Sequence, residues 1–407
     1  MQNEETTEQR FLGKKGLIIF LAALTAFPAL STDLYLPALP GMTDYFGVPE
    51  YQTNLTLIVF FIFFAVSMLF WGPLSDRYGR KPVLLVGLAC YTVAGVLCAI
   101  AANVYQLMVF RVLQAVGTGA ANATATAIVK DVYHGRRREV ILAIIQTMTV
   151  LSPAVAPVIG ALILRFTSWR GAFVAQAILG LLVLAGSVIF TETVVQKLTG
   201  NPLASLRRLV AVSRNRAFMF LILNFALVGM ATMAFISGSS YIYQVRFGVS
   251  SQTFSLFFAL FAVASAAGAQ IYVWLSRRWH RNKIITGCFV ASAVSGALVL
   301  LLGTRGPWAF ILTFLPTTIA FSCMRPPASY LMLAQHEGDS GSVAGIMIAL
   351  HMAISSIGIV VISLDLWGRL ELIGVMILGF SVISLILWVA IGQPLVRSQE
   401  PSVVSRR

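Results

Sequence analysis

Residues 72–82 read GPLSDRYGRKP and separate two long apolar stretches, residues 53–74 and 82–102. Each stretch is about 20 residues long, and an α-helix of that length crosses the roughly 30 Å hydrocarbon core of a bilayer. Gly72 and Gly79 permit a tight turn between two such helices, because glycine adopts backbone conformations that other residues avoid. The stretch therefore predicts two membrane-spanning helices joined by a short polar turn.

The same alternation of long apolar stretches and short polar connections continues along the whole chain. Of the 407 residues, 58% are hydrophobic and only 11% are charged, which is typical of polytopic membrane proteins and not of soluble domains. The twelve candidate spans are residues 16–39, 53–74, 82–102, 105–129, 140–164, 171–191, 217–240, 251–275, 284–303, 308–333, 342–364 and 371–392. We therefore expect an all-α membrane protein with 12 transmembrane helices.

The net charge of +14 is distributed unevenly over the predicted loops. Most of the 29 Lys and Arg residues fall on the side of the N-terminus, and the opposite side holds only Arg165, Arg170, Arg246, Arg305 and Arg369. Because cytoplasmic loops carry an excess of Lys and Arg, we predict that both termini are cytoplasmic. The first ten residues are acidic and polar, so we expect no cleavable signal peptide. Since no basic stretch interleaves with aromatic residues, we expect no nucleic-acid partner.

The longest internal polar stretch, residues 192–216, divides the spans into six and six. LSDRYGRK at 74–81 aligns weakly with LSRRWHRN at 275–282, and each follows an even-numbered span. Duplicated six-span halves are a frequent plan among secondary transporters. We predict an N-terminal six-helix bundle at 1–191, a cytoplasmic linker at 192–216, and a C-terminal six-helix bundle with its tail at 217–407.

Four polar residues share one face of the predicted span 105–129. Arg111, Gln114, Thr118 and Asn122 are separated by three, four and four positions, which is the spacing of neighbours on a helix surface. An arginine inside the membrane is costly unless it is partnered or hydrated, so we expect a functional role for Arg111. For the other three residues, a buried structural role and a binding role both remain open.

Asp33 is the only one of the fifteen carboxylates that falls well inside a predicted span. Pro28 and Pro37 flank it, so we expect the helix to be irregular there. Apolar surroundings favour the neutral form of a carboxyl group, whereas a nearby cation such as Arg111 favours the charged form. A carboxylate balanced in this way can bind a proton on one side of the membrane and release it on the other. The alternative is a permanent structural pair of Asp33 with Arg111.

The residue order in GPLSDRYGRKP resembles the signature loop of the major facilitator superfamily, G-x-L-[SA]-D-R-x-G-R-[RK]. In that family the loop latches the cytoplasmic ends of helices and gates the exchange between conformations. The resemblance implies conformational gating by Gly72, Asp76, Arg77, Gly79 and Arg80.

Two further stretches resemble motifs of the same family. RVLQAVGTGAAN at 111–122 resembles the R-x-x-Q-G motif of proton-coupled members. LSPAVAPVIGAL at 151–162 resembles the antiporter motif that ends in G-P-x-x-G-G, with Pro153, Pro157 and Gly160 kept and two of its glycines replaced by alanine. In the family this element marks exporters, so the resemblance favours export over import.

STDLYLPALP at 31–40 resembles the TD-x-YLPA-P stretch of the drug:H+ antiporters of the bicyclomycin/chloramphenicol (Bcr/CflA) type, a branch of the superfamily. WGPLSDRYGRKPVLL at 71–85 and WRGAF at 169–173 match this branch as well. The resemblance implies the MFS fold, with two pseudo-symmetric six-helix bundles. It also implies that Asp33 is the protonatable carboxylate, and we expect Arg111 to take part in proton coupling.

The predicted cargo contacts are polar and aromatic residues near the middle of the spans, because adaptable pockets combine apolar side chains with few polar anchors. The candidates are Asp33, Gln114, Thr118, Phe60, Phe64, Asn224, Phe235, Phe257 and Phe261. Packing against the core or the lipid is the alternative for each aromatic residue. Arg325 and His351 also fall inside spans. We expect Arg325 to snorkel or to form a structural pair, and the alternative is a position in the cavity that favours an anionic or strongly polar cargo. We expect His351 to be packed.

These features favour a proton-coupled secondary transporter for multidrug efflux, an antiporter that exports small amphipathic molecules by alternating access from a bacterial inner membrane. The alternative is a proton-coupled importer of a specific polar metabolite.

We expect no enzyme, since an intramembrane hydrolase would need a pair such as Ser239 and His351 on distant spans. No P-loop is present. We expect no cofactor and no metal, with the proton gradient as the energy source. The expected partners are a small-molecule substrate, protons and the lipid bilayer, with the chain acting as a monomer.

Overall fold

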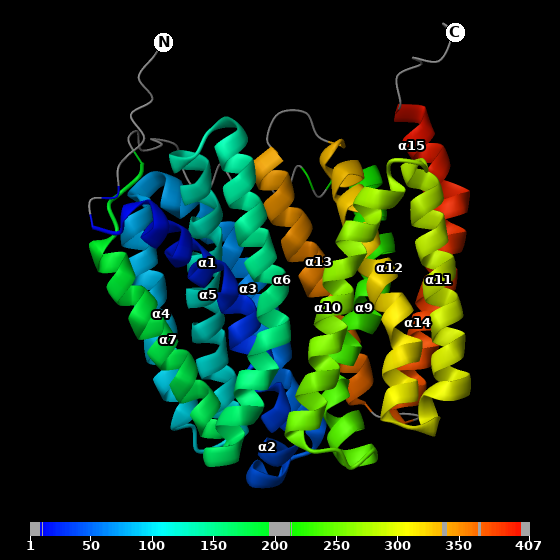
Figure 1. Cartoon of the computed structure of the whole chain (residues 1–407), viewed down its shortest axis with the longest axis horizontal. Helices are drawn as coiled ribbons and strands as arrows, with labels where there is room; N and C mark the ends of the chain where they lie inside the picture. Colours follow the sequence, from blue (N-terminus) through cyan, green and yellow to red (C-terminus); the bar gives the residue numbers. More distant parts are fainter. Residues whose placement is uncertain are drawn as a thin grey trace, which may run out of the picture. The chain divides into compact units, whose positions relative to one another are not determined.

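The computed structural model describes residues 9, 11–194, 212, 214–335, 340–364 and 368–399. In these residues the regular elements are helices joined by short connections (Figure 1). Twelve helical segments among them are long and apolar enough to cross a membrane. The predicted all-α fold with twelve spans is therefore confirmed for this part of the chain.

The helices follow one another with short connections in both halves of the sequence. The first half forms α1 (Gly13–Asp33), η1 (Leu36–Ala38), α2 (Leu39–Phe46), α3 (Glu50–Tyr78), α4 (Arg80–Ala99), α5 (Val104–Val132), α6 (Gly135–Phe166) and α7 (Trp169–Ile189). The second half forms α9 (Arg216–Tyr241), η2 (Ile242–Arg246), α10 (Ser251–Leu275), α11 (Arg281–Leu302), η3 (Gly303–Arg305), α12 (Pro307–Leu333), α13 (Ser340–Ser363), α14 (Arg369–Leu387), η4 (Trp388–Gly392) and α15 (Gln393–Gln399).

Contacts along the chain divide it into two compact units. Unit 1 comprises Met1–Leu206 and Val249–Ala262, and unit 2 comprises Arg207–Gly248 and Val263–Arg407. The predicted linker, residues 192–216, lies mostly outside the described residues. The predicted domain boundaries therefore stay a prediction.

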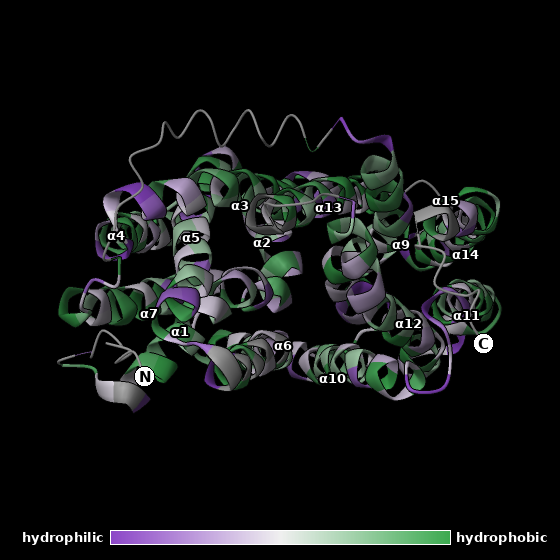
Figure 2. Ribbon diagram, turned by 90° about the horizontal axis from the view of Figure 1, so that it is seen from above, coloured by the Kyte–Doolittle hydropathy of each residue, from purple (hydrophilic) through white to green (hydrophobic). Residues whose placement is uncertain are grey.

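Apolar side chains remain exposed on the helices of both units. Figure 2 shows that hydrophobic residues, in green, predominate along the helical ribbons. Leu182 in α7 is 65% exposed, and Leu301 in α11 is 71% exposed. In water such surface would be unfavourable, whereas lipid chains are as apolar as a leucine side chain. The exposed helix faces are those expected of a protein embedded in a bilayer.

Small residues let α5 pack tightly between α3 and α4 in unit 1. A Cβ atom on Gly117 of α5 would lie 2.5 Å from the carbonyl oxygen of Gly87 and 2.7 Å from the backbone nitrogen of Tyr91, both in α4. A Cβ atom on Gly119 would overlap the side chain of Ser67 in α3. Membrane helices associate through such close backbone approach, because lipid provides no hydrophobic driving force between them.

Unit 2 packs its helices by the same rule. A Cβ atom on Gly358 of α13 would overlap the carbonyl oxygen of Met230 in α9. A Cβ atom on Gly296 of α11 would lie 2.5 Å from the backbone nitrogen of Leu378 in α14. Glycines thus set the spacing of the helix pairs α9–α13 and α11–α14.

We predict that Gly117→Ala lowers the thermal stability of the purified protein in detergent. The added methyl group has no room, since its neighbours are backbone atoms of α4 that cannot rotate away, and overpacking of this kind costs about 1–3 kcal/mol. Gly72→Ala is the matched control, because Gly72 also lies in a helix of unit 1 and its added Cβ atom would meet no atom within 4 Å. Equal unfolding temperatures for the two variants would contradict the close approach of α4 and α5.

Candidate functional site

Asp33 lies at a break in the first membrane-spanning segment. It is the last residue of α1, and the 3₁₀ turn η1 begins at Leu36, so the irregular backbone predicted beside Asp33 is confirmed. The side chain is buried, with 6% of its surface exposed. Its Oδ1 atom accepts a hydrogen bond from Thr32 Oγ1 at 2.9 Å. The carboxyl group is thus enclosed by protein and held by a single hydroxyl group.

Arg111 in α5 is completely buried in unit 1 and is anchored by uncharged oxygen atoms. Its Nη1 atom donates to the carbonyl oxygen of Ser31 at 2.8 Å and to Gln114 Oε1 at 2.6 Å. Its Nε atom donates to the carbonyl oxygen of Thr56 in α3 at 3.5 Å. The guanidinium group therefore links α5 to the ends of α1 and α3.

Aromatic rings surround the same guanidinium group. The Cζ atom of Arg111 lies 4.2 Å from the ring centroid of Phe60, 4.8 Å from that of Tyr35 and 5.9 Å from that of Phe173. A cation over an aromatic face is stabilised by about 0.5–2 kcal/mol, and more strongly when water is excluded. These rings compensate part of the free energy that the buried charge loses on leaving water.

The carboxylate of Asp33 and the guanidinium of Arg111 are not joined in this structure. Arg111 binds the carbonyl oxygen of Ser31, two residues before Asp33, and no ion pair links Asp33 to Arg111 among the residues that the structure describes. The permanent Asp33–Arg111 pair, kept above as an alternative, is therefore wrong for this conformation. Uncharged oxygen atoms bind Nε and Nη1 of the arginine, whereas its buried Nη2 atom has no hydrogen-bond partner in the described part of the chain. The carboxyl group of Asp33 does not serve as its counter-ion.

Glutamine side chains extend this polar network to α7. Gln114 Nε2 donates to Gln176 Oε1 at 2.8 Å, and Gln176 Nε2 donates to the carbonyl oxygen of Leu30 at 3.2 Å. Ser31 Oγ and the hydroxyl group of Tyr91 in α4 are 2.9 Å apart. The backbone just before Asp33 is thus held by side chains from α5 and α7, and the Ser31 side chain is held by Tyr91 from α4.

The other predicted cargo residues are enclosed by the protein. Thr118 is buried and its hydroxyl group donates to the carbonyl oxygen of Gln114 in the same helix, at 2.8 Å. Each of the following is less than a tenth exposed: Phe60, Phe64, Asn224, Phe235, Phe257 and Phe261. Phe60 lies against Arg111, and Phe64 stacks on Phe60 with ring centroids 6.2 Å apart. Phe235 instead stacks on Phe314 in unit 2, with ring centroids 4.0 Å apart. The structure brings only the unit 1 residues of α3 and α5 together with the Arg111 network.

The predicted antiporter motif lies against the Asp33 segment. Pro153 and Pro157 are inside α6, which continues from Gly135 to Phe166. A Cβ atom on Gly160 would overlap the carbonyl oxygen of Leu34, the residue after Asp33. The carbonyl oxygen of Pro157 accepts a hydrogen bond from Ser255 Oγ at 2.8 Å, within unit 1. Gly160 is therefore needed for the approach of α6 to the break in the first span.

The stretch 72–82 forms an ion-pair cluster at the junction of α3 and α4. Arg80 Nη1 donates to Asp76 Oδ1 at 2.5 Å and to Ser75 Oγ at 2.6 Å. Arg80 Nε donates to Asp131 Oδ2, at the end of α5, at 2.8 Å. Arg77 instead lies 5.4 Å from the neighbouring ring of Tyr78. The predicted gating arginine Arg80 thus connects three helices, and Arg77 does not take part.

The turn prediction is right for Gly79 and wrong for Gly72. Gly72 lies inside α3, which continues to Tyr78, since the apolar helix does not stop at the glycine. Gly79 has a φ of 108° and separates α3 from α4. The carboxylate of Glu192 accepts hydrogen bonds from the backbone nitrogens of Arg80 at 2.9 Å and Lys81 at 3.0 Å. A side chain at position 79 would overlap this carboxylate, so glycine is required for its approach to the start of α4.

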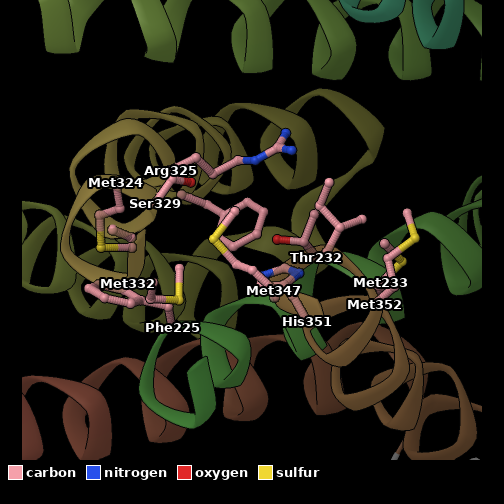
Figure 3. Close-up of a pocket in the computed structure, with 14 residues that line it drawn as sticks. Phe225, Thr232, Met233, Met324, Arg325, Ser329, Met332, Met347, His351 and Met352 are labelled. Carbon is pink, nitrogen blue, oxygen red and sulfur yellow. The ribbon is translucent and has the colours of Figure 1, made fainter. Parts of the chain in front are cut away.

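A cavity of about 200 Å³ lies inside unit 2, between α9, α12 and α13 (Figure 3). Its lining includes Arg325, His351 and several methionines. Asn224 and Phe235, the predicted cargo residues of unit 2, are not among the lining residues. The intramembrane pair of Ser239 with His351 is not formed either, since Ser239 Oγ donates to the carbonyl oxygen of Ile236 and the His351 ring stacks on Phe321.

Comparison with known families agrees with this architecture. Residues 19–363 match the Major Facilitator Superfamily. The chain belongs to this superfamily. Its members are transporters and not enzymes. The twelve candidate spans in the described part of the chain, together with the bacterial relatives, make it a multi-pass bacterial membrane protein.

Two bacterial relatives in the superfamily are named for drug resistance. The chloramphenicol resistance protein of Pseudomonas aeruginosa is 30% identical over 356 residues, which cover 85% of this chain and 84% of that protein. The multidrug resistance protein MdtL of Klebsiella pneumoniae is 31% identical over 254 residues, 62% of this chain and 64% of the relative. They confirm the resemblance to the bicyclomycin/chloramphenicol-type branch.

Solved structures of superfamily transporters share the fold. The peptide transporter POT in complex with sulfate matches with a TM-score of 0.78 at 16% identity, over 96% of this chain and 97% of that one. The nucleoside transporter NupG matches with a TM-score of 0.74 at 12% identity, over 92% of this chain and 99% of that one. At these identities the likeness shows the fold alone, and it confirms the predicted MFS fold.

Sequence reasoning missed several partners in this superfamily member. Asp131, Glu192 and Gln176 lie far along the chain from the residues they bind, so spacing alone gave no signal for them. The cavity left a weak signal. Arg325, Ser329 and Met332 follow one another at four and three positions, which places them on one face of α12.

We predict that Glu192→Ala destabilises the protein by roughly 0.5–2 kcal/mol, the range for loss of a helix cap. The variant removes an anion from the positive end of α4 and leaves two backbone N–H groups without their acceptor. Glu192→Gln keeps one acceptor oxygen, so we expect its stability to lie between that of Glu192→Ala and that of the wild type.

Thermal unfolding in detergent measures this effect. Asp44→Ala is the control, because it also removes a carboxylate from unit 1 but from an exposed position. If Glu192→Ala unfolds at the same temperature as Asp44→Ala, the carboxylate does not stabilise the start of α4.

Proposed function

We propose that the chain is a proton-coupled multidrug exporter, an antiporter that moves small amphipathic molecules out of the cell by alternating access. The observation that carries this proposal is that Asp33 is buried without a cation bound to its carboxyl group. It is the one buried carboxylate among the residues whose burial the structure describes, and Thr32 is its hydrogen-bond partner. A buried carboxyl group without a bound cation is suited to accept a proton, because burial favours its neutral form.

The relatives support drugs as the cargo. Both are named for resistance, one to chloramphenicol and one to multiple drugs. The contact of Gly160 with Leu34 supports export, since it joins the antiporter motif to the segment that carries the protonatable group. We therefore favour export over the import of a polar metabolite.

Proton and cargo would compete at the end of α1. The backbone of Leu30 and Ser31 is fixed by Gln176 and Arg111, so protonation of Asp33 acts on a segment that is tied to α5 and α7. A cargo molecule that displaces the proton acts on the same segment. Entry of each proton supplies about 2.3 kcal/mol per 100 mV of membrane potential and about 1.4 kcal/mol per pH unit.

The ion-pair cluster of Asp76, Arg80 and Asp131 would act as the latch of the transport cycle. Its members come from α3, α4 and α5, and Glu192 ties the segment after α7 to the same point. Separation of these helix ends requires that several charge-assisted hydrogen bonds break together, which favours two discrete arrangements.

The protein would work in the bacterial inner membrane with both termini in the cytoplasm, as the distribution of Lys and Arg indicates. It would act as a monomer and use protons, a small-molecule substrate and the bilayer as partners. The proton gradient would supply the energy without a cofactor.

We predict that Asp33→Asn abolishes substrate-induced proton release. The amide cannot exchange a proton, while its shape and its hydrogen bond with Thr32 are retained. The measurement is the pH change on adding chloramphenicol to concentrated wild-type and variant protein in weakly buffered detergent.

Asp44→Asn provides the control, since it removes an exposed carboxylate of unit 1. Equal release by Asp33→Asn and the wild type would remove Asp33 from coupling. The same variants, expressed in an efflux-deficient host, should show loss of drug resistance for Asp33→Asn and retention for Asp44→Asn.

The direction of transport can be read from everted membrane vesicles. With an acidic lumen, an exporter coupled to proton entry into the cytoplasm accumulates labelled chloramphenicol in the lumen, because protons leave as the drug enters. Dissipation of the gradient should abolish this accumulation. Accumulation that occurs only in right-side-out vesicles with an acidic exterior would favour the importer.

A further inference from the structure

The cavity in unit 2 is lined by three helices of that unit. Its volume is about 200 Å³, and its lining residues come from α9, α12 and α13 (Figure 3). This is smaller than the roughly 300–1,000 Å³ of pockets for drug-sized ligands. The cavity therefore fits a small apolar body, such as one or two fused rings.

Methionine side chains dominate the lining. Met233 comes from α9, Met324 and Met332 from α12, and Met347 and Met352 from α13. Methionine has three rotatable bonds and a polarisable sulfur atom, so it repacks around bodies of different shape and contacts aromatic rings favourably. A cavity with this lining can accept more than one apolar group.

Arg325 adds a cation to this apolar cavity. It lies on α12, eight residues before the helix ends at Leu333, and Figure 3 shows its side chain extended from that helix. Arg325 is partly covered by the protein and partly exposed. No hydrogen bond or ion pair to Arg325 is present among the described residues. The guanidinium group is therefore available to a ligand.

The described part of unit 2 holds no free carboxylate for Arg325. Glu371 is its one carboxylate, and both of its oxygen atoms accept hydrogen bonds at 2.6 Å from Arg246. An intramembrane cation without a partner is unfavourable. A ligand that brings its own anion into the cavity supplies the missing counter-ion.

Three polar side chains line the cavity together with Arg325. Ser329 lies one turn further along α12 and lines the same cavity. Thr232 of α9 and His351 of α13 line it from the other two helices. The His351 ring stacks on Phe321, with ring centroids 5.9 Å apart. The cavity thus combines one cation and a few hydrogen-bonding groups with an apolar lining.

We propose that this cavity binds the carboxylate form of small amphipathic aryl acids, with the carboxylate on Arg325 and the ring system among the methionines. The proposal rests on the proposed export function and names a class of cargo for it. Arg325 offers two parallel N–H groups that match a carboxylate, and such charge-assisted pairs are roughly twice as strong as neutral hydrogen bonds.

The test compares an acid with its neutral amide of the same shape. Binding of 1-naphthaleneacetate and of 1-naphthaleneacetamide is measured by titration calorimetry on the full chain in nanodiscs of zwitterionic lipid. We expect the wild type to bind the acid at least about tenfold more tightly than the amide, as one charge-assisted hydrogen bond would give. Arg325→Gln should lose this preference and keep its affinity for the amide.

Two further variants separate the cavity from general charge effects. Arg277→Gln removes a cation from an exposed position after α10 and should keep the preference for the acid. Ser329→Asp places a carboxylate one turn from Arg325, so it should abolish the preference by pairing with the arginine, whereas Ser329→Asn should retain it. These Ser329 variants test the proposal even if Arg325→Gln fails to fold.

Equal binding of the acid and the amide by the wild type would overturn the proposal, and so would a preference that survives both Arg325→Gln and Ser329→Asp. Either result would leave Arg325 as a side chain that snorkels to the membrane surface. If the wild type confers drug resistance but does not prefer the acid, this inference fails and the export function stands. If it prefers the acid but confers no resistance, the site is supported and the export function fails.

Discussion

The structure of unit 1 depends on how the buried guanidinium of Arg111 is satisfied. A cation that is 0% exposed inside a membrane protein depends on partners within the protein, and in Arg111 the Nε and Nη1 atoms have them while the Nη2 atom has no hydrogen-bond partner among the described residues. Its partners are the carbonyl oxygen of Ser31, the amide of Gln114 and the faces of aromatic rings such as that of Phe60. These groups come from α1, α3 and α5, so a single charge fixes three helices against one another.

The choice of uncharged partners has a consequence for Asp33. If the arginine had paired with this carboxylate, the pair would have held both groups in their charged forms. Instead, Arg111 holds the backbone two residues before Asp33, and the carboxyl group keeps one weak partner, Thr32. In the coupling role proposed for Asp33, a proton would bind and leave without breaking the anchor of α1. Close packing of Gly160 against Leu34 makes the same segment sensitive to α6.

The ion-pair cluster at the start of α4 and the cavity of unit 2 each contain an arginine, but the two arginines have different surroundings and therefore different properties. Arg80 has carboxylates on two sides, Asp76 and Asp131, and forms a stable junction of helix ends. Arg325 has no such partner among the described residues and borders an apolar cavity. The first arrangement suits a latch that holds one conformation, and the second suits the recognition of an anionic ligand. The two arginines differ because the folded chain places carboxylates beside Arg80 and, among the described residues, none beside Arg325.

Sequence by itself determined the fold class, since twelve apolar stretches of spanning length leave helices as the only way to satisfy the backbone in lipid. It also singled out Asp33 and Arg111 as candidates, because charged residues inside apolar stretches are rare, and it singled out Arg80 by the resemblance of residues 72–82 to the signature loop of the superfamily. Only the tertiary structure decided their partners. Glu192 reaches Arg80 across more than a hundred residues, and Arg111 binds a backbone carbonyl that no side-chain pattern records. Long-range contacts depend on helix packing, which the spacing of residues within one helix does not specify.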